Sequence, residues 1–187
     1  KSEEYFTRRD KNATIDVASA LGLKAPLKLI NRGSIANIYQ HPFNPFQIIK
    51  VTGHKKDVQN LWKAQNLNSP NIVKVYGPPK QIGPTAYAII ADKIIGPSMP
   101  YDTNSFIYLI QGEGQGLEFA ADDIYDDESK AEILKAYGRN TDEEKTKLSF
   151  LFRTLYQLEK IYRISLTDFD KNIIDSGENY VIVDMGF

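Results

Sequence analysis

The sequence predicts an α+β protein in two lobes, a small sheet lobe followed by a mainly helical one. Three observations support this fold class. The first half is a series of short apolar or β-branched segments separated by turn residues. Residues 54–67 interrupt that series with helical spacing, which indicates one helix beside the strands. The second half contains the strongest helical periodicity of the chain, over residues 145–162, and closes in a predicted hairpin.

The first half is predicted to form five strands and one helix after a short N-terminal lead. Residues 1–26 are that lead, with residues 16–21 as its helical part and Gly22 as the stop. Pro42, Asn44 and Pro45 separate two extended segments and favour a hairpin between them. The predicted strands cover residues 27–31, 35–40, 46–52, 72–76 and 86–95, and the first lobe is assigned to residues 27–95.

The second lobe, residues 96–187, is predicted to be mostly helical. Leucine and isoleucine side chains recur at steps of three and four along residues 145–162. Thr141 followed by Glu144 forms a capping box before that helix. Shorter helices are predicted at 105–110 and 128–137, and a hairpin with a Ser176-Gly177 turn at 172–183.

Composition excludes several classes of protein. The 187 residues are 42% hydrophobic and 25% charged, which is typical of a globular domain and not of a disordered tail. The absence of cysteine excludes a disulfide framework, a thiolate zinc site and a cysteine nucleophile. A net charge of −1 disfavours a nucleic-acid partner. No apolar run reaches the roughly 20 residues of a membrane span, so we expect a cytoplasmic protein without a membrane partner.

Lys50 is the first candidate for a functional side chain, because it lies inside the apolar strand QIIKV. A lysine is costly to bury unless it meets an anion. The alternative is an edge strand whose lysine extends to solvent. Upstream, the turn at Gly33-Ser34 joins two predicted strands and could bring backbone N–H groups over phosphates, although a single glycine often marks only a turn.

A second group of candidates lies near the end of the chain. Asp168, Asp170 and Asn172 fall within one short predicted loop, and Asp184 follows the predicted hairpin. The hairpin should bring its two ends together, and carboxylate and amide oxygens suit a hard cation such as Mg²⁺. Solvated acids in a turn are the alternative.

These features occur in the order found in protein kinases, which the chain resembles over residues 27–187. The resemblance is closest to the small serine/threonine protein kinases of short-tailed bacteriophages, and looser to minimal kinase-like effectors of pathogenic bacteria. The segments that carry it are Tyr39, His41-Pro42, Ile49-Lys50-Val51, Lys55-Lys56-Asp57, the SPNIVKVY stretch at 69–76, the hinge-like ADKIIG at 91–96 and Asp184-Met185-Gly186.

The resemblance implies a magnesium- and ATP-dependent kinase that transfers the γ-phosphate to a serine or threonine hydroxyl of a protein substrate. A phage or pathogen enzyme of this kind would act on host proteins in the host cytoplasm. The implied roles are α- and β-phosphate binding by Lys50, phosphate cover by Gly33 and Ser34, adenine contacts by Asp92 to Ile94, proton abstraction by Asp168, and magnesium binding by Asn172 and Asp184.

The chain departs from the kinase pattern at several positions. Asn31 and Ala36 stand where the glycine-rich turn usually has its other glycines. Asn60 stands where the helix usually carries the acidic partner of the lysine, and Asp57, one turn earlier, is the substitute. The catalytic loop is one residue short. Counting back from the asparagine places Thr167 at the base position, whereas alignment on the following apolar residue places Asp168 there, with Asp170 as the backup.

The chain ends three residues after Asp184, without an activation segment. We therefore expect either a cut polypeptide or a minimal kinase whose substrate platform is missing or supplied in trans. Two other functions stay open: a catalytically inactive kinase-like binding module, and a phosphotransferase that acts on a small molecule or transfers a nucleotidyl group. The kinase prediction requires Lys50 to face Asp168 and Asp184 across one nucleotide-sized cleft.

Overall fold

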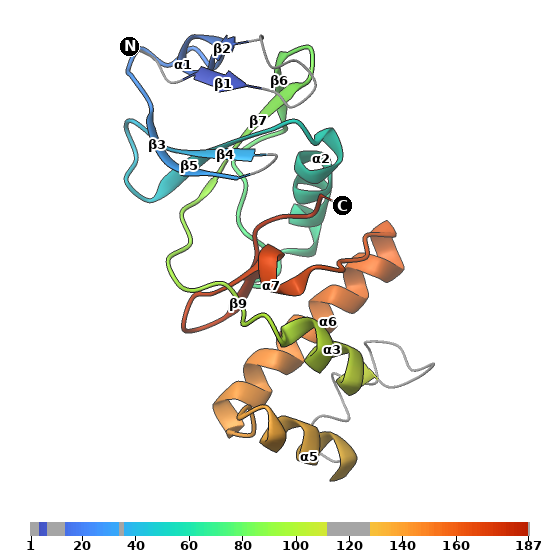
Figure 1. Cartoon of the computed structure of the whole chain (residues 1–187). Helices are drawn as coiled ribbons and strands as arrows, with labels where there is room; N and C mark the ends of the chain where they lie inside the picture. Colours follow the sequence, from blue (N-terminus) through green and yellow to red (C-terminus); the bar gives the residue numbers. More distant parts are fainter. Residues whose placement is uncertain (1–3, 7–13, 34–35, 112–127, 187) are drawn as a thin grey trace. The chain divides into compact units, whose positions relative to one another are not determined.

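A computed structural model describes residues 4–6, 14–33, 36–111 and 128–186. The chain divides into two compact units (Figure 1). The first consists mainly of Lys1–Gln65 and Val73–Lys93, and the second mainly of Asn66–Ile72 and Ile94–Met185.

The first unit is built on a five-stranded antiparallel sheet, which confirms the predicted α+β class. Its strand order is β3-β4-β5-β7-β6, so β5 is the central strand. β-branched side chains dominate β5, and β4 contains Ile38 and Tyr39, all of which favour extended backbone. The strands are β3 (Lys28–Arg32), β4 (Ala36–Gln40), β5 (Gln47–Thr52), β6 (Lys80–Gly83) and β7 (Ala86–Asp92).

Residues 17–27 of the N-terminal lead pack on one face of this sheet. Two short strands, β1 (Glu4–Phe6) and β2 (Thr14–Asp16), pair antiparallel and precede the four-residue helix α1 (Val17–Ala20) (Figure 1). The helix predicted at residues 16–21 is confirmed by α1 and its N-cap Asp16, whereas the strands β1 and β2 were not predicted. The buried cluster between the lead and the sheet contains Val17, Ala18, Leu27, Tyr39, Ile49, Val51, Ala86 and Ala88.

Helix α2 (Lys55–Ala64) belongs to the same unit and contacts β7. Its apolar side chains Val58 and Leu61 are buried, as the helical spacing predicted. The helix continues into a 3₁₀ turn, η1 (Gln65–Leu67). The Gln65 side chain caps this end by donating to the Leu61 and Val73 carbonyls and accepting from the Val75 N–H.

The predicted strand at 72–76 is replaced by two isolated bridges. Ile72 pairs with Ile182, and Val75 pairs with Ala91. The chain leaves one unit for the other inside this segment, so neither sheet gains a continuous ladder. The fifth strand is β6 instead, whose sequence KQIG has weak strand propensity. Its pairing with β7 through the short connection at Pro84 and Thr85 decides its conformation.

The predicted β4–β5 hairpin is confirmed, and His41 organises its turn. The His41 Nδ1 accepts hydrogen bonds from the Phe43 and Asn44 N–H groups, each at 3.2 Å. The Gln40 side chain donates to the carbonyls of His41, Asn44 and Gln47 across the turn. Burial lowers the pKa of His41 below its ordinary value of 6.5.

The lowered pKa predicts a pH-dependent stability. The unfolded chain binds the proton more readily than the folded chain, so the free energy of unfolding should fall as the pH drops below about 6.5. Urea unfolding at pH 7.5 and 5.5 measures this loss. The variant His41→Asn keeps an acceptor in the turn but does not titrate there, so it should lose less stability than the natural chain. Equal losses in both proteins would contradict the assignment.

The second unit is mainly helical, and its long helix α6 begins where the capping box predicted. The Thr141 Oγ1 accepts from the Glu144 N–H at 3.2 Å. Helix α7 replaces the predicted loop that carries the acidic residues. The elements are α3 (Thr103–Gln111), α5 (Glu128–Ala136), α6 (Asp142–Tyr162), α7 (Phe169–Asn172), β8 (Ile173–Asp175) and β9 (Tyr180–Ile182).

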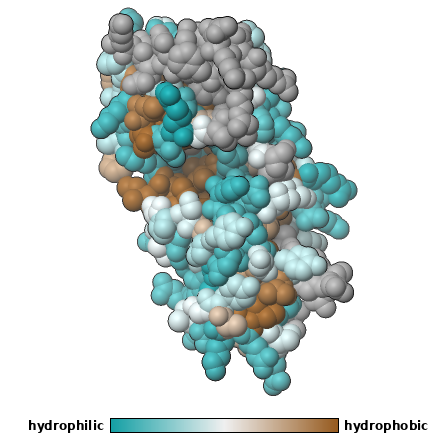
Figure 2. Space-filling model, viewed as in Figure 1, coloured by the Kyte–Doolittle hydropathy of each residue, from teal (hydrophilic) through white to brown (hydrophobic). Residues whose placement is uncertain are grey.

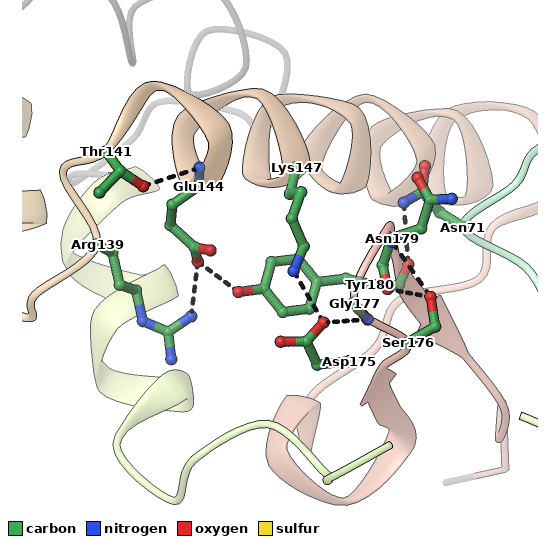
Figure 3. Close-up of polar contacts among 10 residues, drawn as sticks. All are labelled: Asn71, Arg139, Thr141, Glu144, Lys147, Asp175, Ser176, Gly177, Asn179 and Tyr180. Carbon is green, nitrogen blue, oxygen red and sulfur yellow. Dashed lines mark hydrogen bonds and ion pairs between the residues drawn. The ribbon is translucent and has the colours of Figure 1, made fainter. Parts of the chain in front are cut away.

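A polar network fixes the β8–β9 hairpin to α6 (Figure 3). The Tyr180 hydroxyl donates to Glu144, which also pairs with Arg139 at 3.5 Å. Burial and the Glu144 carboxylate raise the pKa of Tyr180, so the phenol stays a donor. Lys147 lies over the Tyr180 ring and pairs with Asp175 at 2.8 Å. Burial alone would raise the pKa of Asp175, but hydrogen bonds from Lys147 and the Gly177 N–H outweigh it and lower that pKa.

The segment after β7 runs along β8. The Asp175 N–H donates to the Pro97 carbonyl at 2.8 Å, and the Met99 N–H donates to the Ile173 carbonyl at 3.1 Å. Gly96 permits this approach, because a Cβ at that position would lie 1.8 Å from the Asp175 carbonyl oxygen. Its φ of +151° is also rare for residues other than glycine.

Apolar surface is gathered in separate patches on the face shown in Figure 2, within a mainly hydrophilic surround. Large exposed side chains include Phe43 and Phe46 in the β4–β5 turn and Ile95 and Tyr101 after β7. Of the helices that the structure describes, none is long and apolar enough to cross a bilayer.

Candidate functional site

Lys50 is buried in the central strand and forms an ion pair with α2. Its Nζ lies 2.5 Å from Asp57 Oδ2, and the two residues are 4% and 1% exposed. The prediction that an acid one turn before Asn60 meets the lysine therefore matches the geometry. The alternative prediction, a lysine that extends to solvent from an edge strand, does not match the structure, because β5 has neighbouring strands on both sides.

The position of Asp57 in α2 explains why this acid can replace one at position 60. Asp57 is the third residue of the helix, where the helix dipole favours a carboxylate. Asn60 is also buried on α2 but is uncharged. Because both Lys50 and Asp57 are buried, their ion pair holds the Lys50 amine at a fixed position beside the sheet.

Two isoleucines that were not identified from the sequence share the sheet face of Lys50. Ile38 lies directly opposite Lys50 in the β4–β5 register, and Ile48 lies two residues before it in β5. Both are half-buried, whereas Ile89, opposite Lys50 on β7, is 2% exposed. Half-buried apolar side chains beside a buried amine could contact the flat base of a nucleotide whose phosphates bind that amine. Strand alternation around Lys50 was the signal that could have identified them.

Gly33 lies at the turn between β3 and β4. Its N–H donates to the Ala36 carbonyl at 2.7 Å. A Cβ on Gly33 would lie 3.0 Å from that carbonyl oxygen, so the turn is tight enough to favour glycine. Ser34, the other predicted phosphate-loop residue, lies outside the described residues.

The predicted adenine-binding segment has part of its backbone already engaged. The Asp92 N–H donates to the Lys74 carbonyl, and the Lys93 N–H donates to the Phe46 carbonyl. The Asp92 carboxylate accepts from the Tyr76 hydroxyl at 2.5 Å. Asp92 therefore offers no backbone donor. The remaining predicted donor is the N–H of Ile94, a half-buried residue.

Asp168, Asp170 and Asn172 lie on a single helical turn. Asp168 is the N-cap of α7, and its carbonyl accepts from the Lys171 and Asn172 N–H groups. Its side chain is exposed and makes no capping hydrogen bond. Asp170 is half-buried and accepts from the Asn104 amide at 2.8 Å. The two carboxylates are therefore in different environments.

The β8–β9 hairpin places the backbone of the two predicted metal ligands, Asn172 and Asp184, at neighbouring strand ends. Ile173 pairs with Ile182, and beyond this pair the Val183 N–H donates to the Asn172 carbonyl at 2.9 Å. Asp184 is the next residue, so it follows directly on the strand end beside Asn172.

One carboxylate and one amide oxygen fit Mg²⁺, which keeps several waters and takes further oxygens from substrate phosphates. Within residues 4–6, 14–33, 36–111 and 128–186, no group of three or more histidine, aspartate or glutamate side chains is arranged to hold a metal by itself. A magnesium ion at Asn172 and Asp184 would thus depend on a phosphate ligand.

A cavity of about 260 Å³ lies in the second unit beside the turn that carries Asp168. It is formed by α3, α6 and the segment that precedes α7. Its walls combine hydroxyl, amide and carboxylate groups with apolar side chains. The lining residues are Asn104, Tyr108, Leu155, Glu159, Ser165, Leu166, Thr167 and Phe169.

The candidate residues thus form two groups. Lys50, Asp57 and Gly33 belong to the first unit, and Asp168, Asp170, Asn172 and Asp184 to the second. Each group lies within its own unit. The single cleft that joins them remains a prediction.

Comparison with protein-family models finds no match, and no curated protein matches the sequence. Solved structures similar to the chain include a thermostable mutant of aminoglycoside phosphotransferase APH(4)-Ia with ADP and hygromycin B. Its TM-score is 0.41 at 9% identity, over 90% of this chain and 69% of that one. The streptomycin–ATP–APH(2")-IIa ternary complex has a TM-score of 0.35 at 14% identity, over 88% of this chain and 66% of that one. The roles of the candidate residues therefore rest on their own geometry.

Proposed function

We propose that the protein is a magnesium- and ATP-dependent phosphotransferase that moves the γ-phosphate to a hydroxyl group, with serine or threonine of a protein as the acceptor. The observation that carries this proposal is the buried Lys50–Asp57 pair. Such a pair contributes little net stability compared with apolar side chains, so its presence in a central strand favours a chemical role.

Each group of residues would contribute to the same nucleotide complex. Lys50, oriented by Asp57, would bind the α- and β-phosphates, while Ile38 and Ile48 would contact the base. Asn172 and Asp184 would supply oxygens for the cation. When bound, Mg·ATP provides the transferable phosphoryl group, and the protein contributes mainly positioning and charge.

Nucleotide binding is tested first, by thermal shift with Mg·ATP. A ligand that binds only the folded state stabilises it by RT ln(1 + [L]/Kd), about 2.7 kcal/mol at 100 times Kd. We expect this stabilisation in the natural chain and its loss in Lys50→Ala and Asp184→Asn. Lys63→Ala, an exposed lysine of α2, is the matched control and should keep it. No shift in the natural chain would contradict the proposal.

Transfer is tested with ATP labelled at the γ or the α position, incubated with cell lysate. Label from the γ position should enter protein and should disappear in Asp184→Asn. Label entering from the α position would show nucleotidyl transfer and contradict the proposal. Binding without any transfer would favour the inactive binding module.

A small-molecule acceptor is the second candidate, and the cavity beside Asp168 favours it. Its volume of about 260 Å³ could hold part of a small polar molecule, and Glu159, Ser165 and Thr167 offer polar contacts. The same labelling experiment separates the two acceptors. Label in acid-precipitated protein supports a protein substrate, whereas label in a soluble product other than ATP and inorganic phosphate, separated by chromatography, supports a small molecule.

A further inference from the structure

Asn104 connects helix α3 to the turn that carries the candidate base. Its Nδ2 donates to Asp170 Oδ1 at 2.8 Å, and its Oδ1 accepts from the Phe169 N–H at 2.8 Å. One side chain thus contacts α7 through both ends of its amide. Neither contact was anticipated from the sequence, because the two partners are 65 and 66 residues away.

The chemistry of the partners fixes the orientation of this amide. A backbone N–H can only donate, so the oxygen of Asn104 must face Phe169. The NH₂ group then faces the carboxylate of Asp170, which needs a donor. The reverse orientation would lose both hydrogen bonds and place two acceptors together.

The first turn of α3, which carries Asn104, is itself held by contacts with Arg139. The neighbouring residue Thr103 is buried and accepts from Arg139 Nη2 at 3.2 Å. The Arg139 guanidinium lies 4.9 Å from the centre of the ring of Phe106, which belongs to α3 like Thr103. Arg139 also pairs with Glu144 at the start of α6 (Figure 3). The first turn of α3 is therefore held against the body of the second unit.

We call the two hydrogen bonds from Asn104 to Phe169 and Asp170 the Asn104 clamp. The clamp places the two aspartates, Asp168 and Asp170, in different environments. Asp168 precedes helix α7 as its N-cap, with a non-helical backbone (φ −98°, ψ 72°), and its exposed side chain makes no capping hydrogen bond. Asp170 lies in the helix itself, and its carboxylate accepts a hydrogen bond from Asn104. The Asp168 carboxylate is therefore the exposed one of the two, four residues before the predicted cation ligand Asn172.

We propose that Asn104 is a positioning residue that fixes the turn at 168–172 through Phe169 and Asp170, which leaves Asp168 as the catalytic base. This inference rests on the proposed phosphotransferase function. As the acceptor oxygen bonds to the γ-phosphorus, its proton passes to the Asp168 carboxylate. The bond between that phosphorus and the β–γ bridging oxygen breaks, and ADP leaves with the electron pair.

The test uses a swap of the two hydrogen-bonding groups. Asn104→Asp keeps the acceptor for the Phe169 N–H but places a second carboxylate against Asp170. We expect kcat to fall about 10- to 100-fold, because small misplacements of a catalytic group cost this much, with little change in KM for ATP. The double variant Asn104→Asp with Asp170→Asn restores a donor–acceptor pair, so kcat should recover most of the loss.

Single variants distinguish the two carboxylates. Asp168→Asn should lower kcat by roughly 10²- to 10⁴-fold, the usual range for a general base. Asp170→Asn can still accept from the Asn104 amide and should be much milder. Ser105→Ala, an exposed neighbour on α3, is the matched control. An Asp170→Asn loss equal to that of Asp168→Asn, or no recovery in the double variant, would overturn the proposal.

Amide hydrogen exchange tests the clamp independently of activity. Asn104→Leu removes the acceptor, so exchange at the Phe169 amide should rise at least about tenfold, while Asn104→Asp should keep its protection. Equal exchange in all three proteins would refute the clamp. If these exchange results hold but the natural chain transfers no phosphate, the proposed function fails while the structural role of Asn104 stands.

Discussion

Removal of either partner of the Lys50–Asp57 pair is expected to destabilise the protein by about 3–5 kcal/mol, because the remaining charge stays buried after the loss of its ion-pair partner. Lys50→Met and Asp57→Asn are the variants of choice, since both nearly preserve side-chain volume. The free energy of unfolding from urea titration measures the effect. Stability unchanged in both variants would contradict the buried pair.

A double variant separates stability from chemistry. Replacing a buried pair by apolar side chains of similar volume is often neutral or stabilising. Lys50→Met with Asp57→Leu should therefore regain most of the lost stability but no stabilisation by Mg·ATP. A double variant that still responds to Mg·ATP as the natural chain does would remove Lys50 from the nucleotide site.

The second large effect is expected at Gly96. An alanine there would place its Cβ 1.8 Å from the Asp175 carbonyl oxygen, which is backbone and cannot rotate away. The segment and β8 would have to separate, with loss of the hydrogen bonds from Asp175 to Pro97 and from Met99 to Ile173. We expect a loss of roughly 3 kcal/mol or more, at the upper end of the range for overpacking.

Gly138→Ala is the matched control for this prediction. Gly138 also has a positive φ, of +67°, but a Cβ there would meet nothing within 4 Å. Its substitution should cost only the backbone strain, about 1–2 kcal/mol. Thermal or urea unfolding of the two variants compares them directly. Equal losses would show that the approach to β8 contributes nothing beyond strain.

The sequence predicted the elements whose signal is local and strong. Helix α6 and its Thr141 cap, the β4–β5 hairpin and the strand of Lys50 agree with the structure, because periodicity and turn residues determine each of them. The pairing of Lys50 with Asp57 was also accessible, since only one acid lies on the buried face of the predicted helix near the required position.

The errors arose where distant contacts decide the conformation. β6 is a strand because β7 pairs with it, although glycine and lysine disfavour extended structure. Residues 72–76 have a strand-like sequence but find separate partners in the two units. The N-terminal lead forms a small β-pair that the single helix signal at Asp16 and Val17 did not suggest.

The site shows the same division. Residue types suggested the amine, the acids and the asparagine as candidates, because few other side chains could perform the proposed chemistry. The partners that orient them, Asn104 for Asp170 and Tyr76 for Asp92, could not be identified, because each hydrogen bond depends on how separate segments pack. The half-buried Ile38 and Ile48 are intermediate, since the strand register that places them around Lys50 requires the hairpin pairing.

The packing of the N-terminal lead on the sheet has a consequence for how this part of the chain can vary. With the lead on one face and α2 beside the other, the central strands β5 and β7 expose few side chains on either side. Substitutions should therefore be tolerated mainly along the border strands β3 and β6, whose side chains are largely exposed. Random mutagenesis of the first unit would be expected to yield functional variants concentrated in those two strands.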